Sequence, residues 1–211
     1  MFMGLVGSEM CIRDRAYLQS LRDIADEFNT LLIFDEVQCG MGRSGKLFAY
    51  ETANVTPDIM GLAKGIGGGF PVGAVLATEK AASGMVPGTH GSTYGGNPLA
   101  MAAANAVLDV MLEKDFLASV LKKGTKLKND LVSLVEKHST VLESVRGVGL
   151  MLGIKSVGPN LELMAALREN KLLTVVAGEN VVRVLPPLNV SEEEISEAVQ
   201  KIDQTCSQVA S

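Results

Sequence analysis

The 211-residue sequence has few cysteines and histidines, no long apolar run and no cluster of basic residues. Its three cysteines, Cys11, Cys39 and Cys206, are scattered and odd in number, which excludes a complete disulfide framework and fits a reducing cytosol. Its two histidines, His90 and His138, are not clustered with each other or with the cysteines, which argues against a zinc site. No apolar stretch is long enough to span a bilayer, and the net charge of −5 argues against a nucleic-acid surface.

The sequence does contain enough apolar residues for a packed core. Hydrophobic residues make up 47% and charged residues 20%, and 211 residues suffice for one large domain or two small ones. Residues 16–113 alternate helical patterns with short apolar runs and predict an α/β layer, whereas residues 114–211 predict a smaller α+β domain. We expect helices over 16–28, 97–113, 116–137, 159–170 and from 191 onward, and strands over 31–37, 58–63, 72–77, 141–155, 172–176 and 180–185.

Several helices carry specific signals. Asn97-Pro98 combines a cap residue with proline at the first helical position, and Ser191-Glu-Glu-Glu194 is a capping box. Apolar residues at helical spacing predict the inward faces, which are Tyr17, Leu21, Ile24 and Phe28 on the first helix and Leu117, Leu121, Leu127, Leu131 and Leu134 on the helix over 116–137.

Residues 1–15 do not fit the sequence that follows them. They lack the basic start and the small-residue cleavage site of a signal peptide. We expect a non-native junction here, such as an assembly scar, and the alternative is a frayed native start. Sequencing the source gene across codon 15 would distinguish the two.

Two apolar runs each lead to one charged residue. Leu31-Leu-Ile-Phe leads to Asp35, and the run after Pro57 leads to Lys64, which begins a glycine-rich turn. Separately, Asp35 could be an ordinary strand-end carboxylate and Lys64 a solvated loop lysine. Together they predict a site at the rim of one sheet, because a partly desolvated lysine can supply a free amine for Schiff-base chemistry. An aspartate nearby can hold a pyridinium nitrogen protonated, so the pair suits pyridoxal phosphate.

A competing motif follows the first of these strands. Gly40-Met-Gly42-Arg-Ser-Gly45 matches G-x-G-x-x-G, and Asp58 lies about 20 residues further on, as in a dinucleotide-binding fingerprint. The match is weak because only a short helix could follow, and Asp58 precedes its strand. A glycine loop that crosses an interface is the other interpretation, and a dinucleotide-binding module stays open as an alternative.

An arginine interrupts the apolar strand before Pro186-Pro187. A guanidinium in that position needs an anion, so Arg183 would bind a carboxylate in bidentate fashion or form a structural salt bridge to a protein carboxylate. Ser92 and Thr93 lie in a glycine-rich stretch whose backbone N–H groups could approach a phosphate, although composition alone favours an ordinary polar loop.

Several long motifs in order give the chain a resemblance to a known family. Phe34-Asp35-Glu-Val-Gln38-Cys-Gly-Met-Gly-Arg-Ser-Gly, Ala63-Lys64-Gly-Ile-Gly-Gly-Gly-Phe-Pro and Thr89-His-Gly-Ser-Thr93-Tyr-Gly-Gly-Asn-Pro resemble class III aminotransferases. The ending Asn180-Val-Val-Arg183-Val-Leu-Pro-Pro is similar to the branch that acts on acetylornithine. The resemblance runs from about residue 16 to the end. It implies part of a fold type I large domain that binds pyridoxal 5'-phosphate, followed by a small α+β C-terminal domain.

The resemblance also implies roles around the cofactor. Lys64 matches the lysine that attaches the cofactor and moves the substrate proton, and Asp35 matches the partner of the pyridine nitrogen. Val37 matches the residue packed on the ring face, and Gln38 the residue near its phenolic oxygen.

Further implied roles concern substrate and partner. Arg183 matches the arginine that binds the substrate α-carboxylate. Ser92 and Thr93 match the stretch that reaches the cofactor phosphate of the neighbouring subunit, which implies a homodimer. The implied reaction moves the terminal amino group of N-acetylornithine to 2-oxoglutarate in the cytoplasm, within arginine biosynthesis. Ornithine or 4-aminobutyrate stays open as the amino donor.

Two departures from the family's pattern stand out. Cys39 occupies a position where threonine is expected. The chain also corresponds to roughly the C-terminal half of a family member, so the glycine-rich phosphate cradle, the stacking aromatic residue and the second substrate arginine of the first half are not expected in it. An inactive, association-prone fragment is therefore a further alternative.

Overall fold

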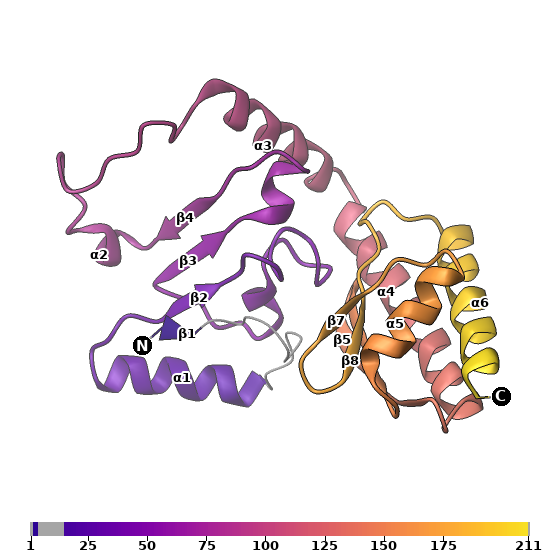
Figure 1. The fold of residues 1–211 in the computed structure, drawn as a ribbon. Helices are drawn as coiled ribbons and strands as arrows, with labels where there is room; N and C mark the ends of the chain where they lie inside the picture. Colours follow the sequence, from indigo (N-terminus) through magenta and orange to yellow (C-terminus); the bar gives the residue numbers. More distant parts are fainter. Residues whose placement is uncertain (1, 4–14, 211) are drawn as a thin grey trace. The chain divides into compact units, whose positions relative to one another are not determined.

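The computed structural model describes residues 2–3 and 15–210, which form two compact units (Figure 1). Of the described residues, the first unit comprises 2–3, 15–42 and 46–117, and the second comprises 43–45 and 118–210. The predicted junction over residues 1–15 lies mostly outside the described residues. Phe2 and Met3 form a short strand, and Arg15 begins a helix.

The first unit is built on a four-stranded sheet with strand order β1-β2-β3-β4. Its strands are β1 (Phe2–Met3), β2 (Ile33–Asp35), β3 (Ile59–Leu62) and β4 (Ala74–Ala77). β1, β2 and β3 are parallel, and β4 pairs with β3 in antiparallel orientation. Because Asp35 is paired with Gly61, the carboxyl ends of β2 and β3 lie side by side at one edge of the sheet.

The helix α1 (Arg15–Glu27) packs on this sheet with a different face from the predicted one. Its buried residues are Leu18, Leu21 and Ala25, which share a core with Leu32 and Phe34. Of the predicted stripe only Leu21 is buried, whereas Tyr17, Ile24 and Phe28 are exposed. The two stripes overlap at Leu21. The fully buried Ala25 lets the helix approach the sheet more closely than the larger Ile24 and Phe28 would.

The remaining helices of this unit follow local signals. They are the 3-10 helices η1 (Ala49–Thr52) and η2 (Lys64–Gly67), and the α-helices α2 (Glu79–Ala82) and α3 (Pro98–Met111). The predicted start of α3 is confirmed, because the Asn97 side chain accepts a hydrogen bond from the Ala100 N–H at 2.9 Å.

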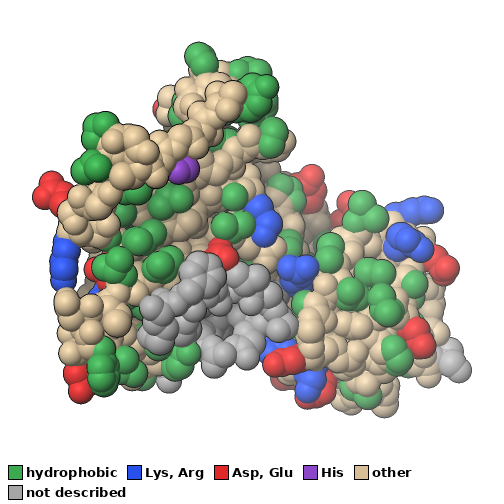
Figure 2. Space-filling model, turned by 60° about the vertical axis from the view of Figure 1, so that its left-hand side comes forward, with side chains coloured by type: hydrophobic (Ala, Val, Ile, Leu, Met, Phe, Trp, Pro, Cys, Tyr) green, Lys and Arg blue, Asp and Glu red, His purple; other side chains and the backbone are tan. Residues whose placement is uncertain are grey.

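The stretch from β4 to α3 leaves large hydrophobic side chains on the surface. Figure 2 shows hydrophobic side chains exposed on one face of the molecule. Those of this stretch include Val75, Leu76, Met85, Val86, Tyr94 and Leu99, with Val75 74% and Tyr94 82% exposed. Exposure of this extent is typical of a surface that contacts another protein segment.

The second unit is an antiparallel sheet with helices on one side (Figure 1). Its elements are α4 (Phe116–Lys137), β5 (Leu142–Val148), β6 (Met151–Ser156), α5 (Asn160–Glu169), β7 (Val175–Ala177), β8 (Val181–Val184) and α6 (Glu192–Val209). The strand order is β5-β6-β8-β7. The capping box of α6 is confirmed, since Ser191 Oγ accepts the Glu194 N–H and Glu194 Oε2 accepts the Ser191 N–H.

The long helix α4 has the predicted bounds but a partly different buried face. Leu127, Leu131 and Leu134 are buried as predicted, whereas Leu121 is 43% exposed and Val120 is buried in its place. Gly124 belongs to the same face, and a Cβ atom there would lie 2.3 Å from the backbone of Gly149. The buried face of α4 is therefore set by the close approach of the two backbones at Gly124. The spacing of the leucines did not indicate this approach.

Candidate active site

Asp35 and Lys64 lie at the same edge of the first unit's sheet. Asp35 is the last residue of β2 and is half-buried, and Lys64 is the first residue of η2, two positions after β3 ends at Leu62. Since β2 and β3 are parallel with Asp35 opposite Gly61, both side chains come from the carboxyl edge of the strand pair. This edge is where open α/β sheets place their ligands.

The backbone at Lys64 has a conformation that side chains rarely adopt. Lys64 has a φ of 46°, in the left-handed region, which costs about 1–2 kcal/mol for a residue with a Cβ atom. Its side chain is exposed and borders an open cavity of about 550 Å³, which is lined by Ala63, Lys64, Gly69, Phe70, Pro71, Val72 and Gly73. Strain of this kind is found at functional sites, and here it directs an amine to a cavity mouth.

The Asp35 carboxylate is oriented by the turn that follows it. Asp35 Oδ1 accepts a hydrogen bond from the Val37 N–H at 2.9 Å, and the Cys39 thiol contacts the Asp35 carbonyl oxygen at 3.7 Å. Val37 and Gln38 are half-buried in this turn. The structure thus groups the predicted residues Asp35, Val37 and Gln38 at the end of one strand.

A buried acid inside this turn was not predicted. Glu36 is fully buried, and its carboxylate accepts hydrogen bonds from the Ala49 and Tyr50 N–H groups at 2.6 and 2.8 Å. Burial raises the pKa of Glu36, and the two N–H groups partly offset that effect. The available signal was a second acid directly after a buried strand. Its partners could not be read from the sequence, because they return from a loop 13 and 14 residues away.

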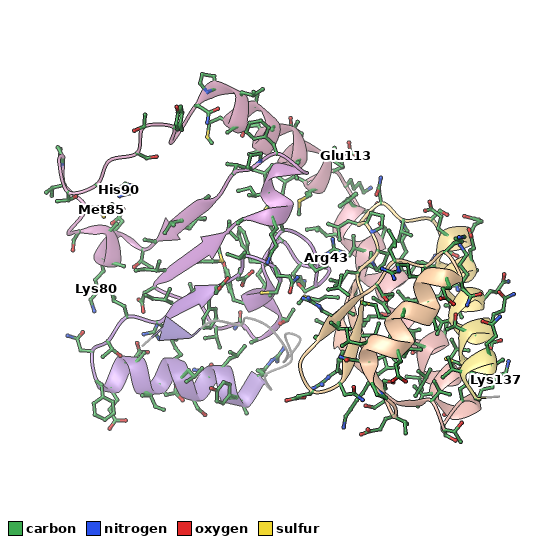
Figure 3. All side chains as sticks on the ribbon, viewed as in Figure 1. Arg43, Lys80, Met85, His90, Glu113 and Lys137 are labelled. Atoms are coloured by element: carbon green, nitrogen blue, oxygen red, sulfur yellow. The ribbon has the colours of Figure 1, made fainter. Side chains whose placement is uncertain are left out.

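Ser92 and Thr93 lie in the segment between α2 and α3, where Figure 3 labels Met85 and His90. Both are exposed, and Ser92 Oγ accepts a hydrogen bond from the Gly95 N–H at 2.9 Å. The residues that line the cavity beside Lys64 do not include them. A role for Ser92 and Thr93 at a neighbouring subunit's cofactor therefore stays a prediction.

Arg183 belongs to the second unit and is half-buried in β8. It is paired with Gly153 of β6 on one side and with Val175 of β7 on the other. Arg146 of β5 is in turn paired with Gly153, so both arginines occupy one row on the same face of the sheet. Arg146 forms an ion pair with Glu179 at 2.6 Å. Because Glu179 already balances the charge of Arg146, Arg183 is the candidate of this row for binding a carboxylate.

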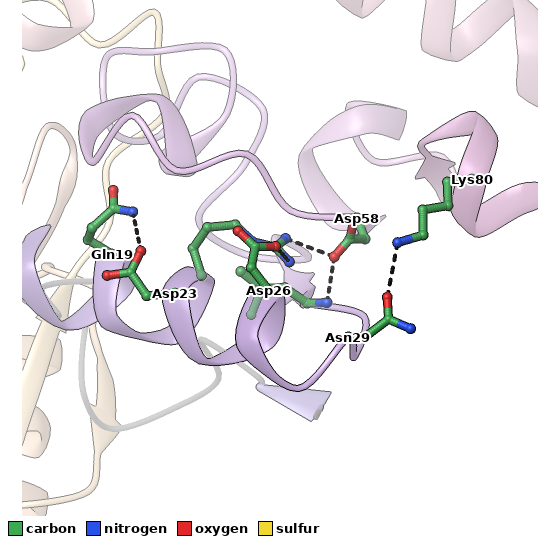
Figure 4. A network of polar contacts seen from close by, with 8 residues as sticks. Gln19, Asp23, Asp26, Asn29, Asp58 and Lys80 are labelled. Carbon is green, nitrogen blue, oxygen red and sulfur yellow. Dashed lines mark hydrogen bonds and ion pairs between the residues drawn. The ribbon is translucent and has the colours of Figure 1, made fainter.

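The structure argues against the dinucleotide alternative. The loop over residues 40–45 continues in turns, and the next helical element is η1, four residues of 3-10 helix rather than a phosphate-binding α-helix. The Asp58 carboxylate is already engaged, since it accepts hydrogen bonds from the Arg22 guanidinium and the Leu32 N–H, both at 2.8 Å (Figure 4). Gly45 has a φ of 85° and lies against Leu121, so packing explains the glycine.

The described residues fit a pyridine cofactor attached to a lysine. They combine an exposed amine at a cavity mouth with a carboxylate at the neighbouring strand end. Over the same residues, no group of three or more His, Cys, Asp or Glu side chains could hold a metal ion. None of the helices in the described ranges is long and apolar enough to cross a membrane.

Comparison with known proteins identifies the family. The family model for class III aminotransferases matches residues 7–206, and the chain belongs to this family, as its motifs predicted. The match includes part of the segment over 1–15 that was expected to be non-native. A fold type I α/β chain covering part of the full enzyme is likewise confirmed by similar solved structures.

Relatives found by sequence are named acetylornithine aminotransferase, and similar solved structures include both acetylornithine and ornithine aminotransferases. The chain is 57% identical over 196 residues to acetylornithine aminotransferase 1 of Bradyrhizobium diazoefficiens, covering 93% of this chain and 48% of that protein. It is 56% identical to acetylornithine aminotransferase of Mesorhizobium japonicum, covering 88% and 46%. Similar structures include acetylornithine aminotransferase from Elizabethkingia anophelis (36% identity, TM-score 0.86, 93% and 53% covered) and ornithine aminotransferase from Plasmodium yoelii (34%, 0.86, 93% and 53%). The chain spans about half the length of the relatives it matches.

Proposed function

We propose that the chain is part of a pyridoxal phosphate-dependent aminotransferase that transfers the terminal amino group of N-acetylornithine to 2-oxoglutarate, a reaction of arginine biosynthesis. The observation that carries the proposal is the placement of Asp35 and Lys64 at the carboxyl edge of two parallel, paired strands. The identity of 57% with a protein named acetylornithine aminotransferase supports the choice of donor.

The roles of the residues follow from their chemistry. Pyridoxal phosphate, when bound, supplies an electron sink for the electrons that remain after a proton leaves the substrate carbon. Lys64 Nζ would attach the cofactor and, once displaced by the substrate amine, take the proton from that carbon. The Asp35 carboxylate would accept a hydrogen bond from the ring nitrogen and keep it protonated. Val37 would pack on the ring face, and Gln38 would lie near the phenolic oxygen.

The second unit would supply a substrate carboxylate site. Arg183 can form two parallel hydrogen bonds with a carboxylate, the geometry in which guanidinium recognition is strongest. In 2-oxoglutarate the α-carboxylate is bonded to the carbon that receives the amino group, whereas in N-acetylornithine it lies at the other end of the chain from the reacting amine, so Arg183 in one fixed position would bind the α-carboxylate of one of the two substrates.

A homodimer in the cytoplasm completes the proposal. The exposed segment with Ser92 and Thr93 would reach the cofactor phosphate of a second copy, and the exposed hydrophobic side chains from Val75 to Leu99 support a contact surface there. Cys39 and Cys206 are buried and form no disulfide within the described residues, which is compatible with a reducing compartment.

The decisive experiment titrates the purified chain with pyridoxal phosphate, reduces the mixture with borohydride and maps the labelled peptide. We expect an absorbance band of the bound cofactor and label on Lys64, with none in the Lys64→Ala variant. Stable label on another lysine in Lys64→Ala would refute the assignment. No band from a folded chain would show that this half-length chain is an inactive piece of its parent.

The amino donor is tested separately on the full-length parent protein. Ornithine is the second candidate, because structures of ornithine aminotransferases resemble the chain with TM-scores of 0.86. N-acetylornithine, ornithine and 4-aminobutyrate are compared at equal concentration with 2-oxoglutarate as acceptor. We expect the highest kcat/KM for N-acetylornithine, and a preference for either of the other amines would correct the donor.

A further inference from the structure

Every polar group of Glu36, the residue after Asp35, takes part in a hydrogen bond. Glu36 Oε2 accepts the Ala49 N–H at 2.6 Å, and Oε1 accepts the Tyr50 N–H at 2.8 Å. Its own N–H donates to the Gly61 carbonyl at 2.9 Å, and its carbonyl accepts the Gly40 N–H at 3.0 Å. The residue therefore connects β3, the turn that follows β2, and the start of η1.

The packing around Glu36 leaves no room for rearrangement. A Cβ atom at Gly40 would lie 2.7 Å from the Glu36 carbonyl oxygen and 3.1 Å from Oε2. The side chain of Glu36 is fully buried, so its carboxylate has no access to water in place of the two N–H groups. Removing one acceptor would leave a buried N–H group unsatisfied, which is more costly than losing an exposed hydrogen bond.

The turn fixed in this way contains the groups predicted to contact the cofactor. Val37 follows Glu36 directly, and its N–H orients the Asp35 carboxylate at 2.9 Å. Gln38 comes next in the same turn. The loop from 37 to 48 leaves at Glu36 and returns to it at Ala49, so the Glu36 carboxylate closes this loop on itself.

We propose that Glu36 is a positioning residue, which holds the turn after β2 so that the Asp35 carboxylate and Val37 keep their orientation toward the cofactor. The inference rests on the proposed function. In this role Glu36 does not touch the cofactor or the substrate. It acts through its two neighbours in the chain, Asp35 and Val37.

The test compares Glu36→Gln with a matched control, Glu51→Gln. Glutamine keeps the size of the side chain but offers one acceptor oxygen, so an amide NH2 would face one of the two N–H groups. Glu51 is exposed and accepts the Phe48 N–H at 2.8 Å beside the same 3-10 helix. The control therefore removes a carboxylate charge next to η1, keeps one acceptor oxygen for the Phe48 N–H, and leaves the contacts of Glu36 in place.

Two readouts are measured on the 211-residue chain. Hydrogen exchange of the apo chain is expected to become faster over residues 37–42 in Glu36→Gln, with α1 at its wild-type rate as the reference within the same unit. Cofactor affinity, from the absorbance titration, is expected to fall about tenfold in Glu36→Gln and by less than about twofold in Glu51→Gln. Gly40→Ala would crowd the carbonyl oxygen and the Oε2 atom of Glu36 with the carboxylate retained, and it should give the same pattern.

The outcomes separate the two proposals. A folded wild-type chain that takes up no cofactor on Lys64 overturns the cofactor-positioning role in this chain, whereas the proposed function of the parent is judged by Lys64 labelling in the full-length protein. If the wild type does take up cofactor, equal losses of affinity in Glu36→Gln and Glu51→Gln overturn the positioning role alone. Faster exchange throughout α1 in both Glu36→Gln and Gly40→Ala would mean a purely structural role and would also overturn it.

Discussion

The ion pair between Asp58 and Arg22 provides a quantitative test of how α1 is attached to the sheet. Asp58 Oδ2 accepts hydrogen bonds from the Arg22 guanidinium and the Leu32 N–H, both at 2.8 Å, and both charged side chains are more than four-fifths buried. Hydrogen bonds to charged groups contribute about 1.5–3 kcal/mol each and those between neutral groups about 0.5–1.5 kcal/mol, so an amide oxygen in the place of Oδ2 would accept both bonds but hold each more weakly by about 1–1.5 kcal/mol. We therefore expect Asp58→Asn to lower the free energy of unfolding of the first unit by about 2–3 kcal/mol.

The pH dependence of this loss has a definite sign. Partial burial alone would raise the pKa of the Asp58 carboxyl, but hydrogen bonds from Leu32 and Arg22 outweigh it and lower the pKa below its ordinary value of 3.8. A carboxyl with a depressed pKa in the folded state contributes stability above its unfolded pKa, and that contribution is lost as the pH falls through the folded value. The difference between wild type and Asp58→Asn should be full at neutral pH and should shrink below about pH 4.

Tyrosine fluorescence during urea unfolding isolates the first unit, because all three tyrosines, Tyr17, Tyr50 and Tyr94, lie in it and tryptophan is absent from the sequence. The control is Asp26→Asn. Asp26 also pairs with Arg22, at 2.6 Å, but its side chain is 66% exposed, so its loss should cost no more than about 0.5 kcal/mol. Equal losses in Asp26→Asn and Asp58→Asn, or a gap that widens in acid, would refute the reasoning.

Three further variants test other parts of the chain. Lys64→Ala should leave tyrosine-detected stability at the wild-type value, because the lysine side chain is exposed and alanine retains the Cβ atom that causes the left-handed strain, while cofactor labelling is lost. Gly124→Ala should lower the thermal midpoint of the second unit by circular dichroism, since the new Cβ would lie 2.3 Å from Gly149, whereas Gly158→Ala, with open space around it, should not. Hydrogen bonds from His138 and Lys137 lower the pKa of Asp203. Asp203→Asn should therefore lower the free energy of unfolding by about 1 kcal/mol at pH 7, and this loss should shrink below about pH 4. An unchanged loss at about pH 3 would contradict the prediction.

The features that the sequence predicted correctly are determined locally. The cap at Asn97 and the capping box at Ser191 need only neighbours within one helical turn, and both are present. The bounds of α4 follow from a periodicity sustained over six turns. In each case the information lies within the segment itself, and packing elsewhere cannot alter it.

The errors concern which of two possible faces is buried. In α1 the stripe through Leu18 and Ala25 competes with the stripe through Ile24 and Phe28, and spacing alone does not decide between them. The contact with Phe34 decides, because the small Ala25 allows close approach. Glu36 was missed for a related reason, since its partners at Ala49 and Tyr50 are brought near only by the return of a loop.

The two edges of the first unit's sheet differ in how their charges are satisfied. At the amino edge, Asp58 is bound by a guanidinium and a backbone N–H, so its charge is neutralised inside the chain. At the carboxyl edge, Lys64 is exposed beside a cavity, and the backbone that presents it is in a left-handed conformation. An ion pair within the chain, such as that of Asp58, stabilises the fold. A charged side chain that a strained backbone presents to a cavity, such as that of Lys64, is available to a ligand. Removal of the Asp58 carboxylate should therefore lower stability without loss of Lys64 labelling in the folded fraction. Removal of the Lys64 amine should abolish the labelling and leave stability unchanged.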